Sequence, residues 1–81
     1  MHVRVKLFAQ LRDRAGESEL TCDVPATATV ADVWTALVTR HPALAPFASS
    51  VSCAVNATYA KTRTQVQDGD EVAFLPPVSG G

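Results

Sequence analysis

The residues with the clearest chemical potential are the last eight, 74–81, which read FLPPVSGG. A carboxylate accepts a nucleophile only after it gains a better leaving group, such as the AMP of an acyl-adenylate made from ATP. Glycine, which has no side chain, leaves an α-carboxylate least hindered for that reaction and passes through a narrow channel. One interpretation is therefore that the α-carboxylate of Gly81 is the reactive group, activated by another enzyme that uses ATP. The alternative is an inert, frayed tail.

The two prolines before the glycines favour the first interpretation. Pro76 and Pro77 lack N–H groups and hold the chain extended, so they cannot continue a sheet. The six residues from Pro76 to Gly81 would span about 20 Å if fully extended. We therefore expect a folded domain over residues 1–75 and an extended tail over residues 76–81, long enough to enter a pocket on another protein.

Composition excludes several classes of function. A length of 81 residues allows one domain, and a formal net charge of -1 provides no basic stripe for nucleic acid. No apolar run approaches the roughly 20 residues that span a bilayer, and the N-terminal segment has no signal-peptide core. We therefore expect a cytoplasmic protein that binds neither nucleic acid nor membrane.

The sequence gives little support for a metal site or a redox pair. Cys22 and Cys53 are far apart, and each is in phase with apolar neighbours. The cysteines and the two histidines show no metal-ligand spacing. We expect buried, reduced thiols and neither a metal nor a stably bound cofactor.

The hydrophobic periodicity predicts the elements that must position the tail. Alternation predicts strands at 3–8, 19–24, 51–55 and 71–75, and a short edge strand within 56–67 that includes Tyr59 and Val66. Residues 10–16 favour a helical turn that Gly16 ends. One strong helix is expected from the N-cap Thr29 to His41, with a capping box at Asp32.

The order is thus β-β-α-β-β, and one helix covers only one face of a four-stranded sheet. We predict an α+β fold in which the apolar helix stripe packs on the sheet. The stripe comprises Val30, Val33, Trp34, Leu37 and Val38, and the sheet face comprises Val3, Val5, Leu7, Leu20, Cys22, Val24, Val72 and Phe74.

Three large apolar residues do not fit that core. Phe8 and Leu75 are out of phase with the buried residues of their strands, so both face the uncovered side if the first and last strands are neighbours. Tyr59 is placed to join them. They are either scattered surface residues or a partner-binding patch beside the root of the tail.

The stretches KLFAQLRDRAGE, AVNATY and DGDEVAFLPPVSGG resemble the MoaD family, the small subunits of molybdopterin synthase. These proteins belong to the MoaD/ThiS group of sulfur carriers, and the resemblance implies their ubiquitin-like β-grasp fold. It also implies that a MoeB-like E1-type enzyme adenylates Gly81, which a sulfur donor enzyme then converts to a thiocarboxylate.

The resemblance implies a partner as well. The tail residues Pro76, Pro77, Val78, Ser79, Gly80 and Gly81 would enter the active site of a MoaE-like large subunit in a heterotetramer. There Gly81 would donate its sulfur to precursor Z in molybdenum cofactor biosynthesis. The family's apolar docking face would fall on Phe8, Tyr59 and Leu75.

Other functions remain open at this point. The chain could carry sulfur to another product, such as a thiazole or an amino acid. It could be a ubiquitin-like modifier conjugated through Gly81, or a binding module with an inert tail. In every case the chain is not expected to be an enzyme on its own.

Overall fold

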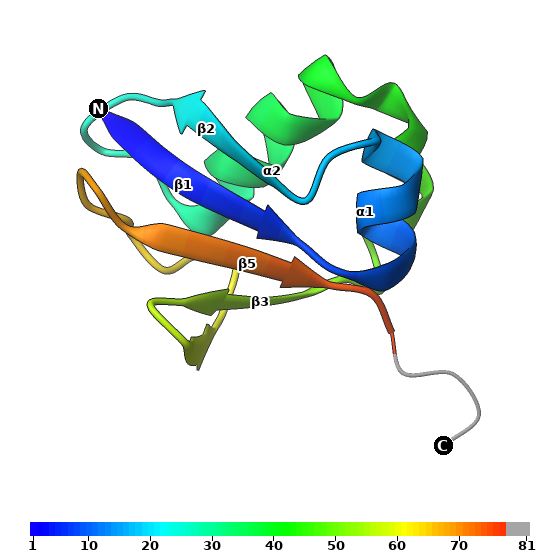
Figure 1. Ribbon diagram of the computed structural model, residues 1–81. Helices are drawn as coiled ribbons and strands as arrows, with labels where there is room; N and C mark the ends of the chain where they lie inside the picture. The colour runs from blue at the N-terminus through cyan, green and yellow to red at the C-terminus, as the bar shows by residue number, and fades with distance from the viewer. Residues whose placement is uncertain (78–81) are drawn as a thin grey trace.

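The computed structural model describes residues 1–77 (Figure 1). The predicted reactive residue Gly81, together with Val78, Ser79 and Gly80, lies outside the described residues. The strands are β1 (His2–Leu7), β2 (Glu19–Asp23), β3 (Ser52–Val55), β4 (Thr58–Ala60) and β5 (Glu71–Leu75). The helices are α1 (Ala9–Ala15), α2 (Val30–Arg40) and the 3-10 helix η1 (Pro42–Phe47).

The strands form one mixed, five-stranded sheet in the order β2-β1-β5-β3-β4. β1 pairs with β5 in parallel, and the other neighbouring pairs are antiparallel. The first and last strands are therefore neighbours, which is the condition under which Phe8 and Leu75 were expected to share the uncovered face. The short edge strand predicted within 56–67 is β4, so the sheet has five strands and not the four counted in the β-β-α-β-β order.

Helix α2 packs across one face of the sheet (Figure 1). Its N-terminus is fixed by the predicted capping box: the Thr29 N–H donates to Asp32 Oδ2 (2.9 Å), and the Asp32 N–H donates to Thr29 Oγ1 (3.4 Å). These bonds satisfy donors that have no partner inside the helix.

The buried stripe of α2 is narrower than predicted. Val30, Val33 and Leu37 are fully buried, but Trp34 and Val38 are only partly buried. The last two lie on the flank that faces η1, where they line a shallow surface groove. Trp34 still contacts the core, because its ring lies 5.0 Å from that of Phe74.

The structure corrects the prediction for the segment that follows β4. The strand has three residues, and Val66 lies outside it, buried at 1% exposure. Instead of extending the sheet, this segment accepts hydrogen bonds from the start of α2: the Val30 N–H donates to the Thr64 carbonyl and the Ala31 N–H to the Thr62 carbonyl, both at 2.9 Å. It thereby satisfies the first donors of the helix, a long-range role that periodicity does not reveal.

The remaining elements close the ends of the core. Gly16 ends α1 in the left-handed region (φ 79°), as predicted, and the helix buries Leu11. Leu44 of η1 is fully buried, and Arg14 lies 5.9 Å over the Phe47 ring. The sheet residues expected in the core are all buried: Val3, Val5, Leu7, Leu20, Cys22, Val24, Val72 and Phe74.

Candidate partner-docking site

The face of the sheet turned away from α2 carries a row of residues in direct register. Lys6 of β1 pairs with Ala73 of β5, Ala73 pairs with Ala54 of β3, and Ala54 pairs with Tyr59 of β4. Residues in register across a sheet point to the same face, with Cβ atoms about 5 Å apart. Two small side chains therefore lie between two long ones.

This row forms the base of an open groove of about 280 Å³. Phe8, Tyr59 and Leu75, the three residues that strand phase placed outside the core, all line it. Among residues 1–77, Phe8 and Tyr59 are large hydrophobic residues that stand exposed to solvent, with exposed fractions of 43% and 79%. The three residues are therefore brought together in space, which argues against scattered surface positions.

One end of the groove is charged. Lys6 Nζ lies 3.2 Å from Glu71 Oε1, and Arg4 lies 3.8 Å from the same oxygen. Glu71 is the less exposed partner, with 24% of its side chain accessible. The groove thus has a paired carboxylate at one end and apolar side chains at the other.

Local backbone geometry presents the two aromatic side chains. Phe8 was predicted to end the first strand, but β1 ends at Leu7, and Phe8 lies just beyond it in an extended conformation at the N-cap of α1. Tyr59 follows a two-residue turn in which Asn56 (φ 50°) and Ala57 (φ 69°) are both left-handed. The Asn56 side chain accepts a 3.0 Å hydrogen bond from the Glu71 N–H, which ties this turn to β5.

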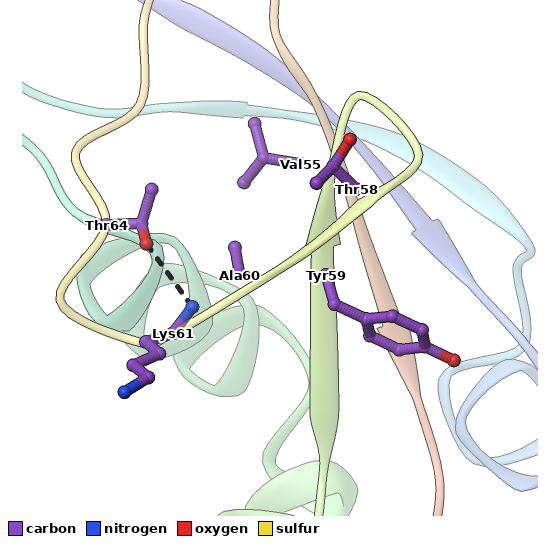
Figure 2. Close-up of a pocket in the computed structure, with 6 residues that line it drawn as sticks. All are labelled: Val55, Thr58, Tyr59, Ala60, Lys61 and Thr64. Carbon is purple, nitrogen blue, oxygen red and sulfur yellow. Dashed lines mark hydrogen bonds between the residues drawn. The ribbon is translucent and has the colours of Figure 1, made fainter.

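A second hollow lies on the other side of β4 (Figure 2). It has a volume of about 520 Å³ and is lined by Val55, Thr58, Ala60, Lys61 and Thr64 as well as Tyr59. Figure 2 shows the Tyr59 ring turned away from Thr64, and the backbone N–H of Lys61 donates to Thr64 Oγ1 at 3.3 Å. Tyr59 lines both hollows, but Phe8 and Leu75 line only the first, so the geometry favours the first groove as the functional surface.

The thiols are poorly placed to carry sulfur. Cys22 and Cys53 are both buried, as predicted, and Cys53 Sγ donates to the Ala60 carbonyl at 3.0 Å. Burial raises the pKa of both thiols, and for Cys22 the effect of Glu17 adds to that of burial while Arg40 opposes it. Covered and protonated thiols are weak nucleophiles at neutral pH.

Residues 1–77 contain neither a cluster of metal-binding side chains nor a membrane-spanning helix. No group of three or more His, Cys, Asp or Glu side chains in this part of the chain is arranged to hold a metal ion. Within the same residues, no helix is both long and apolar enough to cross a membrane.

Sequence reasoning missed five residues of the groove: Lys6, Ala54, Ala57, Glu71 and Ala73. Ala54 and Ala73 were detectable, because each is out of phase with a buried neighbour on its strand, but small residues give no hydrophobic signal. The ion pair depends on the parallel register of β1 and β5, which the sequence does not specify. The roles predicted for Pro76, Pro77 and the four residues beyond them stay predictions.

Comparisons with known proteins agree with this fold. A model of the ThiS family matches residues 5–81. The chain is 36% identical to the molybdopterin synthase sulfur carrier subunit of Arabidopsis thaliana, over 100% of this chain and 84% of that protein. It is 38% identical to small archaeal modifier protein 1 of Haloferax volcanii, over 94% of this chain and 97% of that protein.

A solved structure is similar over the same length. The crystal structure of SAMP1 from Haloferax volcanii superposes with a TM-score of 0.90 at 36% identity, covering 100% of both chains. The ubiquitin-like β-grasp fold and the resemblance to MoaD/ThiS carriers are therefore confirmed. The chain belongs to the ThiS family.

Proposed function

We propose that this protein is the sulfur-carrying small subunit of a molybdopterin synthase, with the sulfur held on the carboxyl group of Gly81. One observation carries the proposal. Phe8, Tyr59 and Leu75 gather in one groove, and Leu75 leads directly into Pro76 and Pro77 at the start of the predicted tail. A protein that takes up the tail therefore meets an apolar surface at its root.

The proposed chemistry has three steps. A MoeB-like adenylating enzyme joins the Gly81 carboxylate to the α-phosphate of ATP and releases pyrophosphate. A sulfur donor enzyme then supplies sulfur that displaces AMP and leaves a thiocarboxylate. Finally the thiocarboxylate gives its sulfur to precursor Z in the active site of the large subunit, and water restores the carboxylate. Two such transfers complete one dithiolene.

In this scheme the folded domain serves recognition. Both thiols of the chain are buried, which supports placing the sulfur on the C-terminal carboxyl group instead. We propose that the carrier is non-catalytic, that it acts in the cytoplasm, and that two carriers and two MoaE-like subunits form a heterotetramer. ATP is a substrate of the activating enzyme and is not held by the carrier. The name of the Arabidopsis relative, a sulfur carrier subunit of molybdopterin synthase, supports this assignment.

Mass spectrometry of the intact chain tests the proposal. The chain is co-expressed with its activating enzyme and sulfur donor, and we expect a mass gain equal to one oxygen replaced by one sulfur. The loaded carrier, mixed with the large subunit and precursor Z, is then expected to yield molybdopterin. An unchanged mass after activation contradicts the proposal. A thiocarboxylate that yields product only in thiazole or amino-acid synthesis would identify a carrier for another pathway.

A second candidate function is a ubiquitin-like protein modifier. The 38% identity to small archaeal modifier protein 1 favours it. The same Gly81 adenylate would then react with a lysine amine on a target protein, forming an isopeptide bond and releasing AMP. Higher-mass conjugates that contain this chain, and that disappear when Gly81 is removed, would support this function.

A further inference from the structure

The base of the docking groove is unusual for a sheet. Ala54 and Ala73 lie side by side on β3 and β5, two interior strands, and both face away from α2. Alanine is a poor strand former compared with valine, isoleucine or threonine. Ala54 is 9% exposed and Ala73 is partly exposed, but both face away from α2, so a larger residue at either position would extend into the groove and not into the core under the helix.

Longer side chains enclose the two alanines. Lys6 and Tyr59 continue the same row on either side, and Phe8 and Leu75 line the groove with them. We call this groove, whose base is formed by Ala54 and Ala73, the socket. Its volume of about 280 Å³ exceeds that of one large side chain.

The walls indicate what the socket accepts. Two aromatic rings and a leucine favour an apolar group. The single carboxylate, Glu71, is already paired with Lys6 at 3.2 Å and with Arg4 at 3.8 Å. An entering cation would compete with Lys6 and Arg4 for Glu71, whereas an entering apolar group leaves that carboxylate paired.

Chain continuity indicates which protein covers the socket. Leu75 is a wall of the socket, and the next residues are Pro76 and Pro77. The six residues from Pro76 to Gly81 span at most about 20 Å, so a protein that binds Gly81 lies within that distance of Leu75 and can reach the groove. In the proposed function, that protein is the large subunit of the synthase.

We propose that Ala54 and Ala73 form a socket for one bulky apolar side chain of the large subunit, and that their small size determines the fit. This inference rests on the proposed function, which supplies the partner. Buried residues near the centre of an interface commonly dominate affinity, and a pocket in one partner pairs with a protruding side chain of the other.

Filling the socket tests the inference. Ala73→Val and Ala73→Leu are expected to weaken binding to the large subunit roughly tenfold to a hundredfold, the cost of forcing extra methyl groups into a packed contact. Affinity is measured by isothermal titration calorimetry with the unloaded, full-length carrier. The thermal midpoint of each free carrier is expected to hold or rise, because the groove is open and valine favours strands.

Thr21→Val is the matched control. Thr21 is exposed on the outward face of β2 and does not line the groove. The control variant is expected to bind like the wild type. If Ala73→Leu fails to fold, the test rests on Ala73→Val and Ala54→Val. Weaker binding to the large subunit with an unchanged thermal midpoint supports the inference.

The possible failures are distinguishable. If the wild-type carrier binds the large subunit and the filled variants bind equally well, the socket is wrong and the proposed function stands. If the wild type gains a thiocarboxylate but shows no binding to the large subunit, the proposed function fails and the socket fails with it. A double-mutant cycle identifies the entering side chain, because trimming it on the large subunit should restore the affinity of Ala73→Val.

Discussion

Gly81 differs from the other residues discussed above because its proposed role uses the main-chain carboxyl group and no side chain. The remaining residues of interest are proposed to act through the shape of the surface. Phe8 and Tyr59 provide exposed aromatic area, while Ala54 and Ala73 provide space. The two predictions that follow therefore test the proposed reactive group, Gly81, and the proposed binding surface separately.

Removing Gly81, or adding one alanine after it, should abolish sulfur transfer to precursor Z. The adenylating reaction needs an unhindered glycine carboxylate at the end of the chain. The thermal midpoint should not change, because β5, the last strand of the sheet, ends at Leu75. Product is assayed with the reconstituted synthase. Full activity in either variant would show that sulfur is carried elsewhere.

Replacing Phe8 with aspartate should weaken capture of the large subunit at least tenfold. The new carboxylate would have to lose its water inside an apolar contact, which costs several kcal/mol unless it is paired. Thr21→Asp, on the outward face of β2, serves as the control and should bind normally. Affinity equal to the wild type would mean that Phe8 lies outside the interface.

At the scale of elements, the hairpin between β3 and β4 carries backbone strain. Ala57 has φ 69°, a conformation that favours glycine, and it occupies the second position of a two-residue turn in which Asn-Gly is preferred. This turn sets the position of Tyr59, so the strain lies next to the proposed interface.

Ala57→Gly should raise the free energy of unfolding by about 0.5–1 kcal/mol, because glycine removes the steric cost of a left-handed residue. Urea denaturation measures the change. Gly69→Ala is the reverse substitution and serves as the control. Gly69 has φ 83°, and no atom lies within 4 Å of where an added Cβ would stand, so alanine should lower the stability there through backbone strain alone. A lower stability for Ala57→Gly would contradict the assignment of strain.

Most elements were predictable because their signals are local. Alternation gave the first and last strands within one residue, and the capping box and the His41-Pro42 pair gave both ends of α2. Strand phase also placed Leu75 on the face turned away from α2, whereas Phe8 reaches the groove from the N-cap of α1 and not from β1. What could not be predicted depends on distant contacts, namely the capping of α2 by residues 62–64 and the pairing of Lys6 with Glu71.

At the scale of the whole molecule, stability rests on a small core. A chain of this length is expected to have a free energy of unfolding of about 5–10 kcal/mol. Phe74 is 1% exposed, lies on a central strand and contacts Trp34, so it joins the sheet to α2.

Phe74→Ala should lower the free energy of unfolding by about 3–5 kcal/mol, roughly half of the expected total. The chain has one tryptophan, so the fluorescence of Trp34 reports the loss directly during urea denaturation. Phe74→Leu, which keeps most of the volume, should cost far less. Equal stability of Phe74→Ala and the wild type would show that the contact between the sheet and α2 is unimportant.

The parallel pairing of β1 with β5 has a consequence for biosynthesis. β5 lies between β1 and β3 in the sheet. A nascent chain that lacks residues 71–75 therefore has two separate strand pairs, β1 with β2 and β3 with β4, and no continuous sheet. The domain therefore completes its fold only after β5 has left the ribosome. A prematurely terminated product would remain unfolded and open to proteolysis, and an activating enzyme would encounter only molecules whose translation had passed β5.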